Sequence, residues 1–199
     1  MMTRLGGYVL AGLIVLVLQG CSEQQAQYNA ALRFYYDGEV QEAYRRMLPL
    51  AQAGMPDAQF HVGLEVLKAS VSGRADAQQG YLWMRLAAEK GHLGARYLLA
   101  DQAAKGVRMA GNPAYALEEF GRLAEEGLVP AQWRMVVMLE ADPGRWPELR
   151  RWLQAAAEQG HKAAQTRLIQ AYAAGELGFP VDAARATYWR DRQKGGAFR

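Results

Sequence analysis

The sequence predicts an all-α solenoid of about four to five stacked antiparallel helix pairs, wound as a right-handed superhelix. A nine-residue pattern, A-[EQ]-x-G-x-x-x-A-[QR], occurs four times, and its glycines Gly54, Gly91, Gly127 and Gly160 lie 37, 36 and 33 residues apart. Recurrence at such a period indicates a repeat array. Each glycine follows an amphipathic segment, where a helix end favours a left-handed residue without a Cβ. The small alanines around each turn let two helices approach closely.

Residues 1–20 are predicted to be a lipoprotein signal peptide that lies outside the fold. One positive charge, Arg4, precedes an apolar segment over residues 8–18. This length suits a secretory signal and is short for a transmembrane span. The sequence L-Q-G-C that ends at Cys21 resembles a bacterial lipobox, in which the cysteine is lipidated and becomes the mature N-terminus. An ordinary soluble export signal with an incidental cysteine is the alternative.

Composition limits what the exported part of the chain can do. Cys21 is the only cysteine, so no disulfide framework is expected and stability must come from stacked helices. After residue 20 the chain keeps 22 Lys and Arg against 20 Asp and Glu, a net charge of +2 that gives no case for binding nucleic acid. Polar residues 21–27 are predicted to form a lipidated tether, and residues 28–199 a single domain.

Each repeat is predicted to hold a first-type helix, which ends at the repeated glycine, and a second-type helix, which follows it. A helix over residues 26–36 precedes the array and resembles a second-type helix, and residues 39–53 form the next, first-type helix. In the second-type helices, apolar residues recur four, five and eight positions after the repeated alanine, which indicates one buried side. Gly106 and Gly175 stand at equal offsets and end two of these helices.

Helix-starting signals precede the later first-type helices. They are Asp76, Asn112 with Pro113, Trp146 with Pro147, and Asp182. A tight turn at residues 142–144 explains why the third step of the repeat is the shortest. The last helix, over residues 182–194, is strongly charged, as the end cap of a solenoid should be.

The order A-x-x-W-x-x-x-A-A-E-x-G-H-x-x-A-Q-x-x-L over residues 149–168, repeated over residues 80–99, resembles the Sel-one-like repeat family. This family is an α/α relative of the tetratricopeptide repeat, and the resemblance covers residues 39–196. Arg46 and Glu119 depart from the pattern at the position of Trp83, and Leu149 replaces a small residue. The resemblance implies a binding scaffold, since family members act in envelope assembly, exopolysaccharide secretion and host or signalling contacts.

Catalysis is not expected. His92 and His161 share one position after the turn glycine, which marks them as a repeat feature, and His61 stands alone on a helix. The sequence holds no H-E-x-x-H, no cysteine pair and no G-x-S-x-G motif. We therefore predict a protein that is not an enzyme and that has no catalytic residues, no cofactor and no metal site.

Binding is expected on the helix surfaces, where Trp, Tyr and Arg are favoured anchors. The candidates on first-type helices, off the buried side, are Tyr44, Arg45, Tyr81, Arg85, Arg150 and Arg151. A solvated helix face is the alternative for each. Trp83 and Trp152 lie on the buried side and are predicted to be core. Phe60, Tyr97 and Trp133 share one offset, which favours packing between repeats over an exposed aromatic ladder.

These expectations describe a lipid-anchored, non-catalytic adaptor that holds a partner protein at the bacterial envelope. The alternatives are a regulatory subunit of a cell-wall or exopolysaccharide machine, and a direct binder of glycan or peptidoglycan. Exposed aromatic residues would favour glycan, whereas exposed charges favour protein. Ser22 follows the lipidated cysteine in place of the Asp associated with inner-membrane retention, so we expect the outer membrane, with the solenoid in the periplasm.

Overall fold

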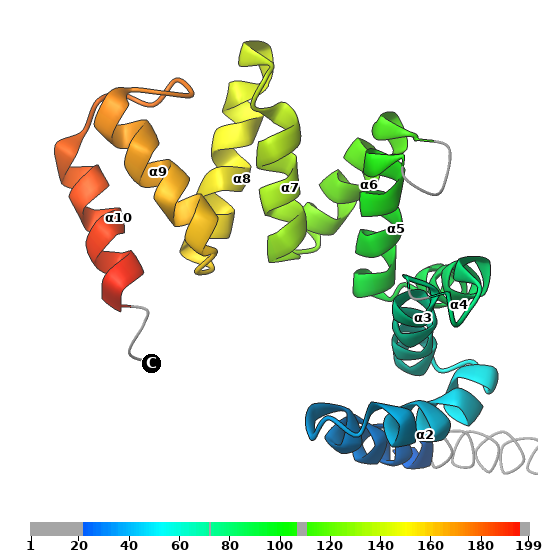
Figure 1. The fold of residues 1–199 in the computed structure, drawn as a ribbon. Helices are drawn as coiled ribbons and strands as arrows, with labels where there is room; N and C mark the ends of the chain where they lie inside the picture. The colour runs from blue at the N-terminus through cyan, green and yellow to red at the C-terminus, as the bar shows by residue number, and fades with distance from the viewer. Residues whose placement is uncertain (1–21, 72, 107–110, 196–199) are drawn as a thin grey trace, which may run out of the picture. The chain divides into compact units, whose positions relative to one another are not determined.

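The computed structural model describes residues 22–71, 73–106 and 111–195, and every regular element among them is helical (Figure 1). After a helix over residues 22–36 come α2 (Val40–Gln52), α3 (Pro56–Val71), α4 (Ala77–Glu89), α5 (Leu93–Lys105), α6 (Pro113–Glu125), α7 (Val129–Leu139), the 3-10 turn η1 (Pro143–Arg145), α8 (Trp146–Glu158), α9 (Lys162–Ala174) and α10 (Ala183–Gly195). The predicted all-α class built from consecutive helix pairs is confirmed.

The repeated glycines end the first-type helices as predicted. All four have left-handed backbones, with φ between +84° and +94°. At the end of α8, the N–H of Gly160 donates to the carbonyl of Ala157, and the N–H of His161 donates to that of Ala156, both at 3.0 Å. The other three turns close with the same two bonds, which satisfy carbonyls that a helix end leaves free.

Side chains cap three of the predicted helix starts. Asp76 accepts from the N–H of Gln78 at 2.8 Å, and Asn112 accepts from that of Tyr115 at 3.0 Å. At the start of α10, Asp182 accepts from the N–H of Arg185 at 2.9 Å. At α8 no side chain caps the helix, which begins with a proline in its first turn. Local sequence therefore determines where these helices begin.

The chain divides into two compact units, one reaching to Arg96 and the other starting at Tyr97, so that the boundary falls within α5. In the first unit, the helix over residues 22–36 and helices α2 and α3 share a core that includes Met47 and Val62, and α4 packs on α3. In the second unit, helices α6 to α10 each pack on the next around a core that includes Phe120. The sequence predicted one domain over residues 28–199. A repeat contacts only its neighbours, so such an array has no single shared core.

Buried glutamines close the helix pairs. Three of them donate from the side-chain amide to a carbonyl eight residues earlier, at 3.1 to 3.3 Å. The pairs are Gln59 with Ala51, Gln132 with Ala124, and Gln165 with Ala157. Each accepting carbonyl lies in the last turn of a first-type helix, where it has no partner within the helix. The final glutamine of the repeated pattern thus links the two helices of a pair.

Two details differ from the sequence-based prediction. Residues 22–27, predicted to be a tether, are helical and continue into the helix that ends at residue 36. Trp83 is only partly buried against the core of the first unit, whereas Trp152 is 5% exposed and belongs to the core of the second. Among the described residues, no helix combines the length and the apolar composition needed to cross a membrane.

Candidate partner-binding surfaces

The six predicted binding residues lie on three first-type helices. Tyr44 and Arg45 are on α2, Tyr81 and Arg85 on α4, and Arg150 and Arg151 on α8. Three of these side chains are exposed and cationic, namely Arg45, Arg85 and Arg151. The other three are half-buried, and each stands ten residues before its turn glycine. Position in the repeat therefore decides which candidates are available to a partner.

Two of the exposed arginines make surface ion pairs. The Arg45 side chain is 74% exposed and lies 3.1 Å from the Glu42 carboxylate on the same helix. Arg151 pairs with Glu125 on α6, and its guanidinium lies 4.0 Å from the centre of the Trp152 ring. Exposed ion pairs contribute little stability, so a partner carboxylate can compete for these cations at small cost.

Arg150 has a structural role inside the second unit. Its Nη1 donates to the carbonyl of Gly178 at 2.7 Å, and its guanidinium lies 5.8 Å from the centre of the Phe179 ring. Both residues belong to the loop between α9 and α10. Sequence analysis did not find this contact, because the loop is 28 residues away along the chain.

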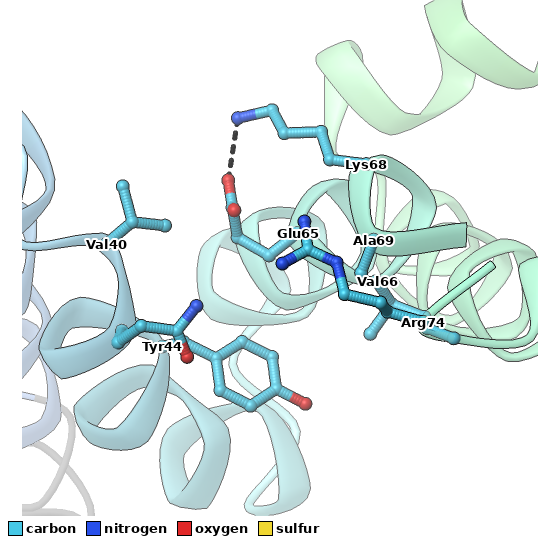
Figure 2. Close-up of a pocket in the computed structure, with 9 residues that line it drawn as sticks. Val40, Tyr44, Glu65, Val66, Lys68, Ala69 and Arg74 are labelled. Atoms are coloured by element: carbon cyan, nitrogen blue, oxygen red, sulfur yellow. Dashed lines mark hydrogen bonds and ion pairs between the residues drawn. The ribbon is translucent and has the colours of Figure 1, made fainter. Parts of the chain in front are cut away.

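The first unit contains a cavity of about 550 Å³ between α2, α3 and the loop that follows α3 (Figure 2). The lining residues are Val40, Gln41, Tyr44, Glu65, Val66, Lys68, Ala69, Arg74 and Ala75. Tyr44 is the predicted binding residue among them. Lys68 donates to the Glu65 carboxylate at 2.7 Å and to the Tyr35 hydroxyl at 2.9 Å, so two of the charged groups at the cavity neutralise each other. Both contacts raise the pKa of Lys68.

Helix α3 is longer than the other second-type helices, and Ala69 of its additional residues lines the cavity. It has 16 residues, against 13 in α9. Helices α5 and α9 are each followed by a glycine with a left-handed backbone, Gly106 with φ of +64° and Gly175 with φ of +74°. The same position in the repeat of α3 is occupied by Ala69. Without a glycine there, α3 continues for three more residues, Ala69 to Val71. Lys68 and Ala69, near the end of this longer helix, form one wall of the cavity.

Histidines and aromatic residues connect successive repeats. The rings of Phe60 and His92 stack with their centres 4.3 Å apart, and those of Trp133 and His161 stack at 5.2 Å. The packing between repeats predicted for Phe60 and Trp133 is therefore confirmed. Tyr97 on α5 packs against Phe120 on α6, the first-type helix of the next repeat, with ring centres 5.4 Å apart, so the prediction is confirmed for this residue too.

The same two histidines cap second-type helices. His92 Nδ1 accepts from the N–H of Ala95 at 3.1 Å, and His161 Nδ1 accepts from that of Ala164 at 3.3 Å. Burial lowers the pKa of both imidazoles, and in His92 the Asp57 carboxylate, 3.3 Å away, opposes this effect. A neutral imidazole is the form that can accept these bonds. The structural role predicted for both histidines is confirmed.

His61 fastens the first helix to α3. The Tyr28 hydroxyl lies 3.1 Å from His61 Nδ1, which is also 3.0 Å from the carbonyl of Asp57. Burial raises the pKa of Tyr28. Among the described residues, no group of three or more His, Cys, Asp or Glu is placed to hold a metal ion. Cys21, the predicted lipidation site, lies outside the described residues.

These features define a helical repeat protein in which the histidines and the three buried glutamines described above are used in packing, and whose described surface includes helix faces and the cavity between α2 and α3. The resemblance predicted from the repeated motif is confirmed by solved structures. The chain is similar to a Sel1 repeat protein from Oxalobacter formigenes, with a TM-score of 0.64 and 30% identity over 78% of this chain and 45% of that one. It is also similar to a protective antigen of uropathogenic Escherichia coli that displays an SLR fold, with a TM-score of 0.69 and 25% identity over 85% of this chain and 38% of the antigen.

No family model matches the chain. An uncharacterized protein of Neisseria meningitidis serogroup B is 35% identical over 128 residues, which cover 63% of this chain and 26% of that protein. The chain thus spans about a quarter of this curated relative and less than half of each solved structure. The shared fold favours a scaffold for protein–protein interaction.

Proposed function

We propose that the chain is a non-catalytic, lipid-anchored adaptor that binds a partner protein at the bacterial envelope. One observation carries the choice of a protein partner. On the first-type helices the exposed candidates are Arg45, Arg85 and Arg151, whereas Tyr44 and Tyr81 are half-buried. An exposed aromatic strip would suit a sugar ring, but exposed guanidiniums suit the carboxylates of a protein.

The anchor is part of the same proposal. The apolar segment over residues 8–18 and the lipobox that ends at Cys21 favour export and lipidation. Lipid on Cys21 would attach the chain next to the first helix, which begins at residue 22. Stable attachment requires more than one acyl chain. Ser22 favours the outer membrane, with the repeats in the periplasm.

Crosslinking in living cells, followed by affinity purification and analysis of both protein and glycan, tests the binding role. We expect one abundant protein partner, which the double variant Arg45→Glu, Arg85→Glu no longer captures. Arg190→Glu, an equally exposed charge reversal on α10, is the matched control and should keep the partner. Recovery of cell-wall fragments without an enriched protein would contradict the adaptor and favour a glycan binder.

Membrane fractionation tests the anchor separately. Cys21→Ala should move the protein from the membrane to the soluble fraction, because the acyl chains provide the attachment. A Cys21→Ala variant that stays in the membrane fraction would show that the lipobox assignment is wrong.

A further inference from the structure

The last repeat shows how this array fills the space beside a helix pair. In the loop between α9 and α10, Leu177 and Phe179 are only 4% and 7% exposed. The Phe179 ring meets the edge of Tyr172, with centres 4.8 Å apart. Arg150 on α8 holds the loop by donating to the carbonyl of Gly178 at 2.7 Å. An apolar segment thus fills this position in the second unit, and a hydrogen bond from the Arg150 side chain to a main-chain carbonyl holds it there.

The repeat numbering aligns this filled position with the cavity of the first unit. Arg150 corresponds to Tyr44, since each stands ten residues before its turn glycine. Tyr172 corresponds to Val66, since each stands eight residues after the repeated alanine. Tyr44 and Val66 both line the cavity (Figure 2). The same walls therefore enclose apolar side chains in one repeat and open space in the other.

The loops explain the difference. The loop before α10 supplies two large apolar side chains, Leu177 and Phe179. Among the described residues of the loop that follows α3, those that line the cavity are Arg74 and Ala75, and neither has a large apolar side chain. Among the described residues that line the cavity there is no Phe and no Leu.

We propose that the cavity between α2 and α3 binds an apolar segment of a partner protein, which inserts a Phe or Leu side chain as the last repeat inserts Leu177 and Phe179. This assignment rests on the proposed binding of a partner protein and identifies where that partner is held. Val40, Val66 and Ala69 supply apolar walls for the inserted side chain. Tyr44 stands at the repeat position from which Arg150 donates to a main-chain carbonyl in the second unit.

Size and charge favour this occupant. A cavity of about 550 Å³ lies within the range of small-ligand pockets and can hold a few side chains. Lys68 and Glu65 are paired at 2.7 Å, which leaves Arg74 as the one further charged residue among the described lining, so the cavity offers no large excess of charge to a highly charged ligand. A second copy of this chain would not insert Leu177 or Phe179, because both are already buried in their own unit.

A peptide from the chain itself is a direct probe. The acetylated and amidated heptapeptide of residues 175–181, labelled with fluorescein, is titrated with the full chain in detergent solution and followed by fluorescence anisotropy. We expect saturable binding that weakens at least about tenfold when the peptide carries Phe179→Ala, because burial of the phenyl ring supplies most of the affinity. Ala69→Phe in the protein fills the cavity and should abolish binding. Ala184→Phe, at an exposed position on α10, is the matched control and should leave binding unchanged.

The place of binding is tested with the same peptide carrying a benzophenone side chain in place of the phenyl ring. After irradiation, crosslinks should fall on residues 40–44 and 65–75. The assignment would be overturned if the wild-type and Phe179→Ala peptides bound equally well, or if the Ala69→Phe and Ala184→Phe proteins lost peptide binding to the same extent. Crosslinks confined to other residues would also overturn it. If Ala69→Phe does not fold, the exposed variant Arg74→Glu and the crosslink positions decide the question.

The two proposals can fail independently. A protein partner captured from cells together with a peptide that does not bind would leave the adaptor in place and remove the cavity as its site. Capture of glycan alone would contradict the adaptor, whatever affinity the peptide shows.

Discussion

Replacing Gly160 should measure the free energy that its left-handed backbone costs a residue with a Cβ, without any added steric contact. Gly160 has φ +87°, and a Cβ built there meets no atom within 4 Å. Gly160→Ala therefore adds no steric contact and only forces an L-residue into the left-handed region, which costs about 1–2 kcal/mol. In a protein of this size that corresponds to a fall in Tm of roughly 2–8 °C.

Gly160→Asn is the matched control, because asparagine tolerates the left-handed conformation better than alanine. Urea unfolding followed by circular dichroism at 222 nm measures the loss, and hydrogen exchange in α8 and α9 shows where it falls. Each repeat contacts mainly its neighbours, so faster exchange should concentrate in these two helices. Equal stability of Gly160→Ala and the wild type, or equal damage by Ala and Asn, would refute the assignment of Gly160 as a left-handed cap.

Two further predictions concern the contacts that join helices. Gln165→Leu removes the amide that donates to the Ala157 carbonyl at 3.1 Å; because this carbonyl still accepts from the Gly160 N–H, the free energy of unfolding should fall by about 0.5–1.5 kcal/mol. An unchanged urea midpoint would show that the glutamine bond adds no stability. Burial lowers the pKa of His161, so the unfolded chain binds more protons and stability should fall as the pH drops below the ordinary His value of about 6.5. His161→Asn keeps a helix cap without a titrating group. Between pH 7.5 and 5.5 the free energy of unfolding of this variant should therefore change less than that of the wild type. An identical change in the two proteins would show that His161 is not the source of the pH dependence.

Features encoded within about ten residues of sequence were predictable. The repeated glycine implied a left-handed turn, and all four turns have it. Asp76, Asn112 and Asp182 implied helix starts, and each caps one. The shared offset of Phe60 and Trp133 implied packing between repeats, because equal positions in a repeat have equal surroundings.

Other features depend on where distant segments meet. The sequence marks Gln165 as repeated, but only the packed helix pair shows that its amide binds the Ala157 carbonyl. The sequence predicted Arg150 as a surface anchor, but in the folded chain its guanidinium donates to the Gly178 carbonyl in the α9–α10 loop. The position of the boundary between the two units within α5 also required the packed structure, since helix periodicity runs through it unbroken.

The sequence by itself determined the all-α repeat architecture, the turns and most helix starts, because each rests on local backbone preferences. Only the tertiary structure decided which equivalent positions are filled and which are open. Tyr44 and Arg150 occupy the same place in their repeats, yet one lines a cavity and the other clamps a loop. The difference arises from the length and side chains of the following loops, and packing of a loop against its helices is a property of the folded chain.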